Sequence, residues 1–256
     1  MNYLEIRKIV DTFLEDVQNE GKEINTYEPI DVFNTNTYHN IISIQLDGYK
    51  EIVLDNETAL ELGGMNKKSF SLIYPIEPPK KEATTNLVHI IGPEIKEFQA
   101  TEISFSLFIL LTINELTNEI YEELRNLAFI SNGIEGFTIR SIPRRFWCRI
   151  SKDVIKKGFS FQLLGNAIVS LYRKKFRENI HSIEILMINS SPELIDKWSE
   201  STAEMRADLN ARWRAKVDTW KKRIDCDYEW TCKICPYFIS CKKLQKLLER
   251  RKNLEI

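Results

Sequence analysis

The fold depends most on one apolar run, Ser104-Phe105-Ser106-Leu107-Phe108-Ile109-Leu110-Leu111-Thr112. A continuous run of aliphatic and aromatic residues predicts a strand that is buried on both faces. Shorter runs of the same kind at residues 87–91, 146–150 and 183–188 predict three further strands. The chain from 87 onward therefore contains enough buried strands for a central sheet.

Helix signals alternate with these strands. Residues 115–131 and 161–177 carry apolar residues at helical spacing, and Ser151 followed by Asp153 predicts the capped start of a short helix. Strands that alternate with helices are typical of layered α/β proteins. We therefore expect an α/β fold with a mixed layered sheet and flanking helices.

The N-terminal part contains weaker signals. Apolar residues at helical spacing predict an amphipathic helix at 4–18, and Asp47-Gly48 between two apolar runs predicts a hairpin. A strand at 69–74 precedes a proline-rich stretch, 75–85, which predicts a linker. The expected regions are 1–80 (N-terminal helix and small β-rich part), 86–190 (α/β domain) and 191–256 (charged helices with a helical, cysteine-rich C-terminal tail).

Composition bounds the class of protein. The 256 residues are 43% hydrophobic with a net charge of −1, which is enough for a globular core and gives no general argument for nucleic acid. The most apolar run, 103–113, is shorter than the roughly 20 residues of a membrane span, and the N-terminus lacks the apolar stretch of a signal peptide. We expect a soluble, cytoplasmic protein with no membrane partner, in which five cysteines do not form a disulfide framework.

Four of the five cysteines form a candidate metal site near the C-terminus. Cys226, Cys232, Cys235 and Cys241 have the spacing C-x5-C-x2-C-x5-C, and no histidine lies near them. Four thiolates suit an iron–sulfur cubane or tetrahedral zinc. A single C-x2-C pair followed by proline favours a [4Fe-4S] cluster, with zinc as the alternative. Cys148 stands apart in a predicted strand and is expected to be a small buried hydrophobe.

A second candidate site surrounds a tryptophan. Arg144, Arg145, Trp147 and Arg149 crowd the start of a predicted strand, and Arg140 precedes them. Arginine binds phosphate with paired hydrogen bonds, and an indole face stacks on a base or a guanidinium. The cluster is either a site for a nucleotide-type ligand or a set of surface arginines beside a half-buried tryptophan. No phosphate-binding glycine motif and no acid–base pair stands out, so catalytic residues stay unassigned.

Several motifs resemble one family in order and separation. The segment Phe146-Trp147-Cys148-Arg149-Ile150-Ser151-Lys152-Asp153, the strand end Ile90-Ile91-Gly92-Pro93-Glu94-Ile95, the stretch Leu62-Gly63-Gly64 and the cysteine approach at 228–235 are similar to the beta subunit of carbon monoxide dehydrogenase/acetyl-CoA synthase. The main resemblance extends from about residue 87 to residue 241, and Leu62-Gly63-Gly64 is a match further upstream. It implies an α/β region like the middle domain of acetyl-CoA synthase.

The resemblance also implies cofactors and ligands. Cys232, Cys235 and Cys241 match cluster cysteines of the family, and Cys226 is the substitute for the fourth. The family's distal nickel needs a C-terminal Cys-Gly-Cys, which does not occur in these 256 residues, so nickel is not expected. The tryptophan with arginines at 144, 145 and 149 resembles the coenzyme A patch of the family, so the resemblance implies a coenzyme A ligand there.

Three functions stay open on these grounds. The first is a redox or accessory protein of one-carbon, CO and acetyl-CoA metabolism, which carries one [4Fe-4S] cluster and has a CO or methyl-transfer enzyme as partner. The second is an active, reduced acetyl-CoA synthase or acyltransferase that uses coenzyme A. The third is a structural zinc or cluster module in a nucleic-acid-binding protein. The locally basic segment 205–252, with 14 Lys and Arg against 6 Asp and Glu, motivates the third function.

Overall fold

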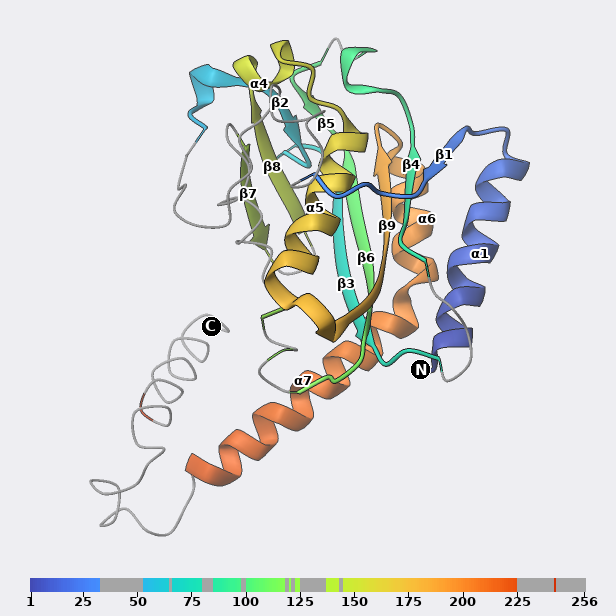
Figure 1. Ribbon diagram of the computed structural model, residues 1–256, viewed down its shortest axis with the longest axis vertical. Helices are drawn as coiled ribbons and strands as arrows, with labels where there is room; N and C mark the ends of the chain where they lie inside the picture. Colours follow the sequence, from blue (N-terminus) through green and yellow to red (C-terminus); the bar gives the residue numbers. More distant parts are fainter. Residues whose placement is uncertain are drawn as a thin grey trace. The chain divides into compact units, whose positions relative to one another are not determined.

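The computed structural model describes residues 1–32, 53–64, 66–79, 85–97, 100–117, 120, 123–124, 137–142, 145–224 and 242 (Figure 1). For residues 137–142, 145, 213 and 216–224 the backbone alone is described.

A five-stranded mixed sheet forms the centre of the fold. Its order is β1-β4-β9-β6-β3, in which β4–β9 and β6–β3 pair in parallel and β1–β4 and β9–β6 pair antiparallel. All nine residues of β6 are buried, so the strand predicted from the long apolar run is confirmed. The strands are β1 (Ile24–Tyr27), β3 (Ser69–Ile76), β4 (Leu87–Ile91), β6 (Phe105–Ile113) and β9 (Ile180–Asn189).

Helices cover both faces of this sheet (Figure 1). On one face α5 (Phe161–Phe176) stacks Phe161 on Phe105 of β6, with ring centroids 5.7 Å apart. On the other face lie α1 (Tyr3–Asn19) and α6 (Pro192–Ser201). Trp198 of α6 is fully buried there, 5.0 Å from the ring of Phe108 and 4.7 Å from that of Phe13. Alternate residues of β6 thus serve two separate hydrophobic layers.

A second sheet of four strands packs beside β3. Its order is β5 (Glu102–Ile103), β2 (Thr58–Leu62), β8 (Arg145–Ser151) and β7 (Phe137–Ile142). The hydroxyl of Ser69 links the sheets, because it hydrogen-bonds to both the N–H and the carbonyl of Phe146. Gly63 allows this approach: its φ is +67°, and a Cβ there would lie 2.2 Å from the carbonyl oxygen of Phe146.

Short elements join the strands. They are the 3-10 turns η1 (Asp55–Glu57), η2 (Ile95–Glu97) and η3 (Arg177–Asn179) and the helix α4 (Lys152–Lys156). Ser151 caps α4 as predicted, since its hydroxyl accepts the N–H of Val154 at 3.3 Å.

The α/β class with mixed sheets and flanking helices is confirmed. The central sheet takes strands from both sides of the expected boundary near residue 80. The hairpin around Asp47-Gly48, most of the helix at 115–131 and the cysteine-rich tail lie outside the described residues. Of the predicted helix, residues 115–117 are not helical, whereas 120, 123 and 124 are.

The chain divides into two compact units, Met1–Met205 and Arg206–Ile256. The helix α7 (Ala203–Ile224) begins in the first unit and continues into the second, where Arg212 forms an ion pair with Asp208 at 2.9 Å. Among the described residues, the helices are too short or too polar to cross a lipid bilayer.

Candidate functional site

The pleat of β8 separates its side chains into two sets. Phe146, Cys148 and Ile150 are completely buried, whereas Trp147 and Arg149 are only partly buried. Alternation with a period of two puts the second pair on the outer face of the four-stranded sheet. The sequence therefore positions an indole and a guanidinium side by side on a rigid strand.

Strand register adds a carboxylate to this pair. Glu61 of β2 lies directly opposite Arg149, and its own neighbours Leu60 and Leu62 are buried. The carboxylate accepts a hydrogen bond from Trp147 Nε1 and another from Arg149 Nε, the latter at 3.2 Å. One partly buried carboxylate thus fixes the orientation of both side chains.

Arg149 also contacts the aromatic ring and a second carboxylate. Its guanidinium carbon lies 5.1 Å from the ring centroid of Trp147, within cation–π range. Its Nη2 donates to Oδ1 of Asp55 in η1 at 2.7 Å. Glu61 is 16% exposed, whereas Asp55 is 90% exposed, so the two carboxylates differ strongly in solvation. Glu61, Asp55, Trp147 and Arg149 together are called the Trp147 cluster.

Within the described part of the chain, the structure brings only some of the predicted site residues together. It brings Trp147 and Arg149 together, and it puts the backbone of Arg140 in register with Trp147 and that of Arg145 in register with Ile142. Arg144 and the four cysteines Cys226, Cys232, Cys235 and Cys241 lie outside the described residues, so their roles stay predictions. Cys148 is fully buried, and burial raises the pKa of its thiol well above the ordinary value, as suits an inert core residue.

Glu61 and Asp55 were not among the site residues predicted from the sequence. They lie 88 and 94 residues before Arg149, and nothing in their local sequence marks them as its partners. An isolated acidic residue between two buried leucines in a strand was the one available signal, because such a residue faces outward beside its cross-strand neighbour.

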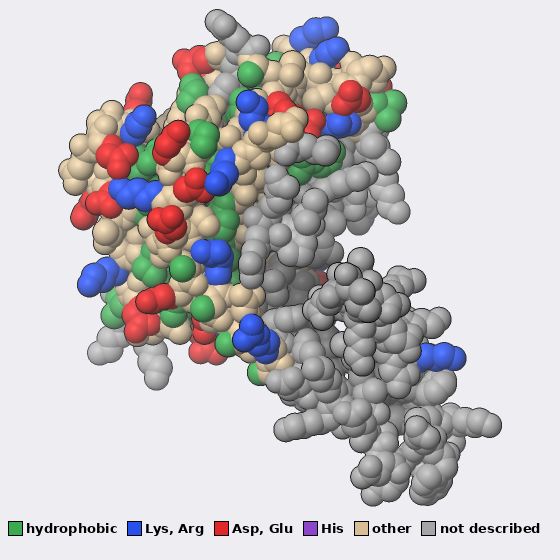
Figure 2. Space-filling model, turned by 180° about the vertical axis from the view of Figure 1, so that it is seen from behind, with side chains coloured by type: hydrophobic (Ala, Val, Ile, Leu, Met, Phe, Trp, Pro, Cys, Tyr) green, Lys and Arg blue, Asp and Glu red, His purple; other side chains and the backbone are tan. Residues whose placement is uncertain are grey.

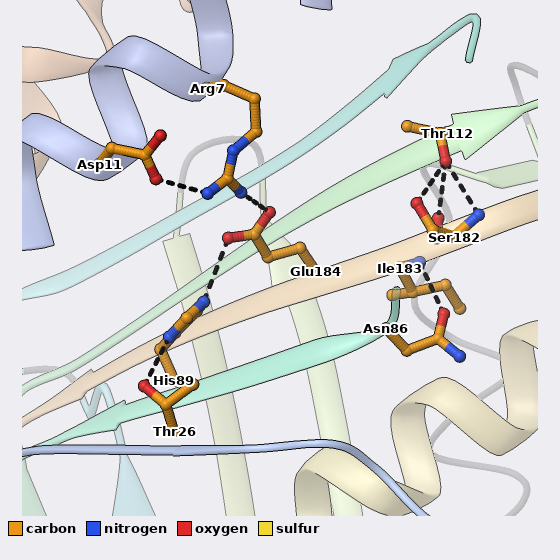
Figure 3. A network of polar contacts seen from close by, with 9 residues as sticks. All are labelled: Arg7, Asp11, Thr26, Asn86, His89, Thr112, Ser182, Ile183 and Glu184. Atoms are coloured by element: carbon orange, nitrogen blue, oxygen red, sulfur yellow. Dashed lines mark hydrogen bonds and ion pairs between the residues drawn. The ribbon is translucent and has the colours of Figure 1, made fainter. Parts of the chain in front are cut away.

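A second polar network lies under α1 (Figure 3). Glu184 of β9 accepts from Arg7 of α1, and its other oxygen lies 3.1 Å from His89 Nε2. His89 Nδ1 lies 2.9 Å from the hydroxyl of Thr26 in β1, and Arg7 also pairs with Asp11. Burial alone would raise the pKa of Glu184, but hydrogen bonds from His89 and Arg7 together lower it.

This network was also missed, since no acid–base pair stood out in the sequence. Glu184 and His89 are 95 residues apart, and both side chains are 7% exposed or less. The helix that supplies Arg7 covers them. We therefore interpret the network as a structural connection between α1 and the sheet, in which the partly exposed Arg7 neutralises the buried charge of Glu184.

Figure 2 shows the face opposite to the view of Figure 1. Lysine and arginine side chains alternate there with aspartate and glutamate over the described surface. A mixed surface of this kind does not create the one-sided positive field that attracts a polyanion. This face therefore gives no support to the nucleic-acid hypothesis.

Fold and site define a class: an α/β protein whose second sheet presents an aromatic–guanidinium pair. The family model of the CO dehydrogenase/acetyl-CoA synthase complex beta subunit matches residues 42–194, more than half of the chain. The chain belongs to this family. The Trp147 cluster lies inside the matched residues, whereas α1, β1 and the four clustered cysteines lie outside them.

Individual relatives agree with this membership. The beta subunit of the acetyl-CoA decarbonylase/synthase complex from Methanopyrus kandleri is 27% identical over 190 residues, 73% of this chain and 39% of that protein. Its counterpart from Methanothermobacter thermautotrophicus is 26% identical over 62% of this chain and 34% of its own length. The carbon monoxide dehydrogenase/acetyl-CoA synthase subunit alpha of Moorella thermoacetica is 22% identical over 73% and 25%, respectively. The alignments thus cover less than half of each relative.

Proposed function

We propose that this protein binds coenzyme A or a similar nucleotide at the Trp147 cluster and serves as an iron–sulfur accessory component of CO and acetyl-CoA metabolism. One observation carries the ligand proposal: Trp147 and Arg149 lie in face contact and are held by the same carboxylate. Sites of this precision are built on strands, where packing limits side-chain motion. The relatives from Methanopyrus kandleri and Methanothermobacter thermautotrophicus are subunits of acetyl-CoA decarbonylase/synthase complexes, which supports a protein partner of the same metabolism.

The chemistry of the site suits a phosphorylated nucleotide. An indole face stacks on a purine, and a guanidinium forms charge-assisted hydrogen bonds with phosphate. Arg144 and Arg145 belong to the same proposed site and would supply further charge for the pyrophosphate of coenzyme A. Because the cysteine segment is not needed for this contact, ligand binding and cluster binding can be tested separately.

The cluster proposal rests on donor chemistry. Cys226, Cys232, Cys235 and Cys241 would each supply one thiolate to a [4Fe-4S] cluster, and soft sulfur donors suit iron–sulfur clusters and zinc alike. When bound, the cluster supplies one-electron transfer. Anaerobic purification with iron, sulfide and zinc analysis tests the proposal, and one zinc without sulfide would contradict it.

Trp147→Ala is expected to weaken coenzyme A binding about tenfold or more, because stacking of a base on an aromatic ring is worth about 1–3 kcal/mol. Trp147→Phe keeps an aromatic face and should lose much less affinity. Isothermal titration of the full chain with coenzyme A measures both values. Equal affinity for wild type and Trp147→Ala, or no binding by wild type, would exclude this site as the coenzyme A site.

The names of the relatives favour a second function. They are synthase subunits, so this protein could carry out acetyl transfer with a metal at the cysteine segment. Nickel in the purified protein together with acetyl-CoA formation from a methyl donor and CO would support this function. Cluster without nickel and without acetyl-CoA would support the accessory function.

A further inference from the structure

Arg149 is held by two carboxylates of very different character. Glu61 contacts Nε, also accepts the indole N–H of Trp147, and is 16% exposed. Asp55 contacts Nη2 at 2.7 Å and is 90% exposed. The first contact belongs to a network with two donors on a rigid strand, and the second is a single surface ion pair.

The difference in solvation between Glu61 and Asp55 decides which of the two carboxylates a ligand can replace on Arg149. A surface ion pair contributes little, because water and salt screen it. A partly buried carboxylate with two hydrogen bonds is harder to remove, since each donor would lose its partner. Asp55 can therefore leave Arg149 by a rotation of its side chain, whereas loss of Glu61 would release Trp147 as well.

The net charge of the Trp147 cluster determines what replacement of Asp55 by a phosphate would change. One guanidinium between two carboxylates leaves the Trp147 cluster with one net negative charge. An incoming phosphate meets repulsion as long as both carboxylates remain. Exchange of Asp55 for the phosphate restores the pairing of Nη2 and removes the nearest repulsive charge.

We propose that Asp55 occupies the phosphate position on Arg149 in the free protein and is displaced by a phosphate group of the nucleotide ligand, while Glu61 stays in place as the positioning residue. This inference rests on the proposed ligand site. It assigns Asp55 as a built-in competitor that limits affinity and favours ligands with phosphate over neutral analogues.

The test compares Asp55→Asn with wild type in titrations of the full chain with coenzyme A and with adenosine, which lacks phosphate. Asp55→Asn is expected to bind coenzyme A about two- to fivefold more tightly at low salt, the size of one surface ion pair. The gain should shrink at high salt, and adenosine affinity should stay unchanged. Asp31→Asn, which removes an exposed charge elsewhere, should change neither affinity.

Glu61→Gln tests the positioning role of Glu61 separately from the competitor role of Asp55. It keeps a side-chain oxygen for one donor but weakens the hold on Trp147, so adenosine should bind more weakly and the tryptophan emission should shift. Coenzyme A should lose less affinity than adenosine, because the substitution also removes a charge that repels phosphate. Unchanged or weaker coenzyme A binding by Asp55→Asn, with wild-type binding that still depends on Trp147, overturns this inference alone. No coenzyme A binding by wild type overturns both the proposed ligand site and the inference.

Discussion

Glu184→Ala is expected to lower the free energy of unfolding by about 3 kcal/mol, the cost of breaking a buried ion pair. The substitution removes the common partner of Arg7 and His89, and His89 is left buried in the sheet. Arg7 remains partly exposed and keeps Asp11, which places the cost at the lower end of the usual range. Urea denaturation followed by circular dichroism measures the change.

Asp11→Ala is the matched control. It removes the other carboxylate of Arg7, but that contact is a half-exposed pair within one helix, so a loss of no more than about 0.5 kcal/mol is expected. Equal effects of the two substitutions would contradict the assignment of Glu184 as the buried centre of the network.

The lowered pKa of Glu184 predicts a pH dependence. Because the folded protein holds this carboxylate charged more strongly than the unfolded chain does, the unfolded state binds the proton first. The stabilisation is therefore complete above the ordinary glutamate pKa and is lost as the pH falls through the lower folded-state value. In Glu184→Gln this part of the acid dependence should disappear, which a series of urea midpoints at decreasing pH would show.

Cys232→Ala is expected to abolish cluster incorporation and to leave less than about a tenth of the wild-type iron and sulfide, since a cubane needs its thiolate ligands. The C-terminal segment should also become more sensitive to protease, because metal binding contributes directly to folding in small metal sites. Anaerobic purification, metal and sulfide analysis and limited proteolysis measure these changes.

Cys148→Ala provides the control for Cys232→Ala. Cys148 is a fully buried residue of β8. Its replacement by alanine is therefore expected to leave the iron and sulfide content unchanged. Full iron and sulfide in Cys232→Ala would show that the assigned ligand set is wrong.

The strands and helices were predictable where local pattern and burial agree. The apolar run of β6, the helical spacing in α1 and α5 and the Ser151 cap of α4 each depend on residues close together in the chain. The strand order was not predictable, because β3 and β6 pair across 36 residues while β4 pairs with β9 across 97. Hydrophobic pattern indicates that a strand is buried but not which neighbour it pairs with.

The candidate site was predictable in its cationic and aromatic half. Trp147 and Arg149 alternate with buried residues, which places them together on the outer face of β8. The carboxylates of the site could not be found in this way, because strand register brings Glu61 to Arg149 and a turn brings Asp55 there. Arg149, which the sequence predicted as part of either a ligand site or a set of surface arginines, is held by two carboxylates.

The sequence by itself determined the α/β class, the buried strands, the membership of a family and the choice of Trp147 and Arg149 as neighbours. Local spacing carries the class, the strands and the choice of neighbours, since the period of a strand or helix decides which residues share a face. The family follows instead from short motifs that resemble those of its members in order and separation. Only the tertiary structure decided that Glu61 and Asp55 balance Arg149 and that Arg7 reaches Glu184 across 177 residues. Charges are paired by packing and register, and these bring together residues that the chain keeps far apart.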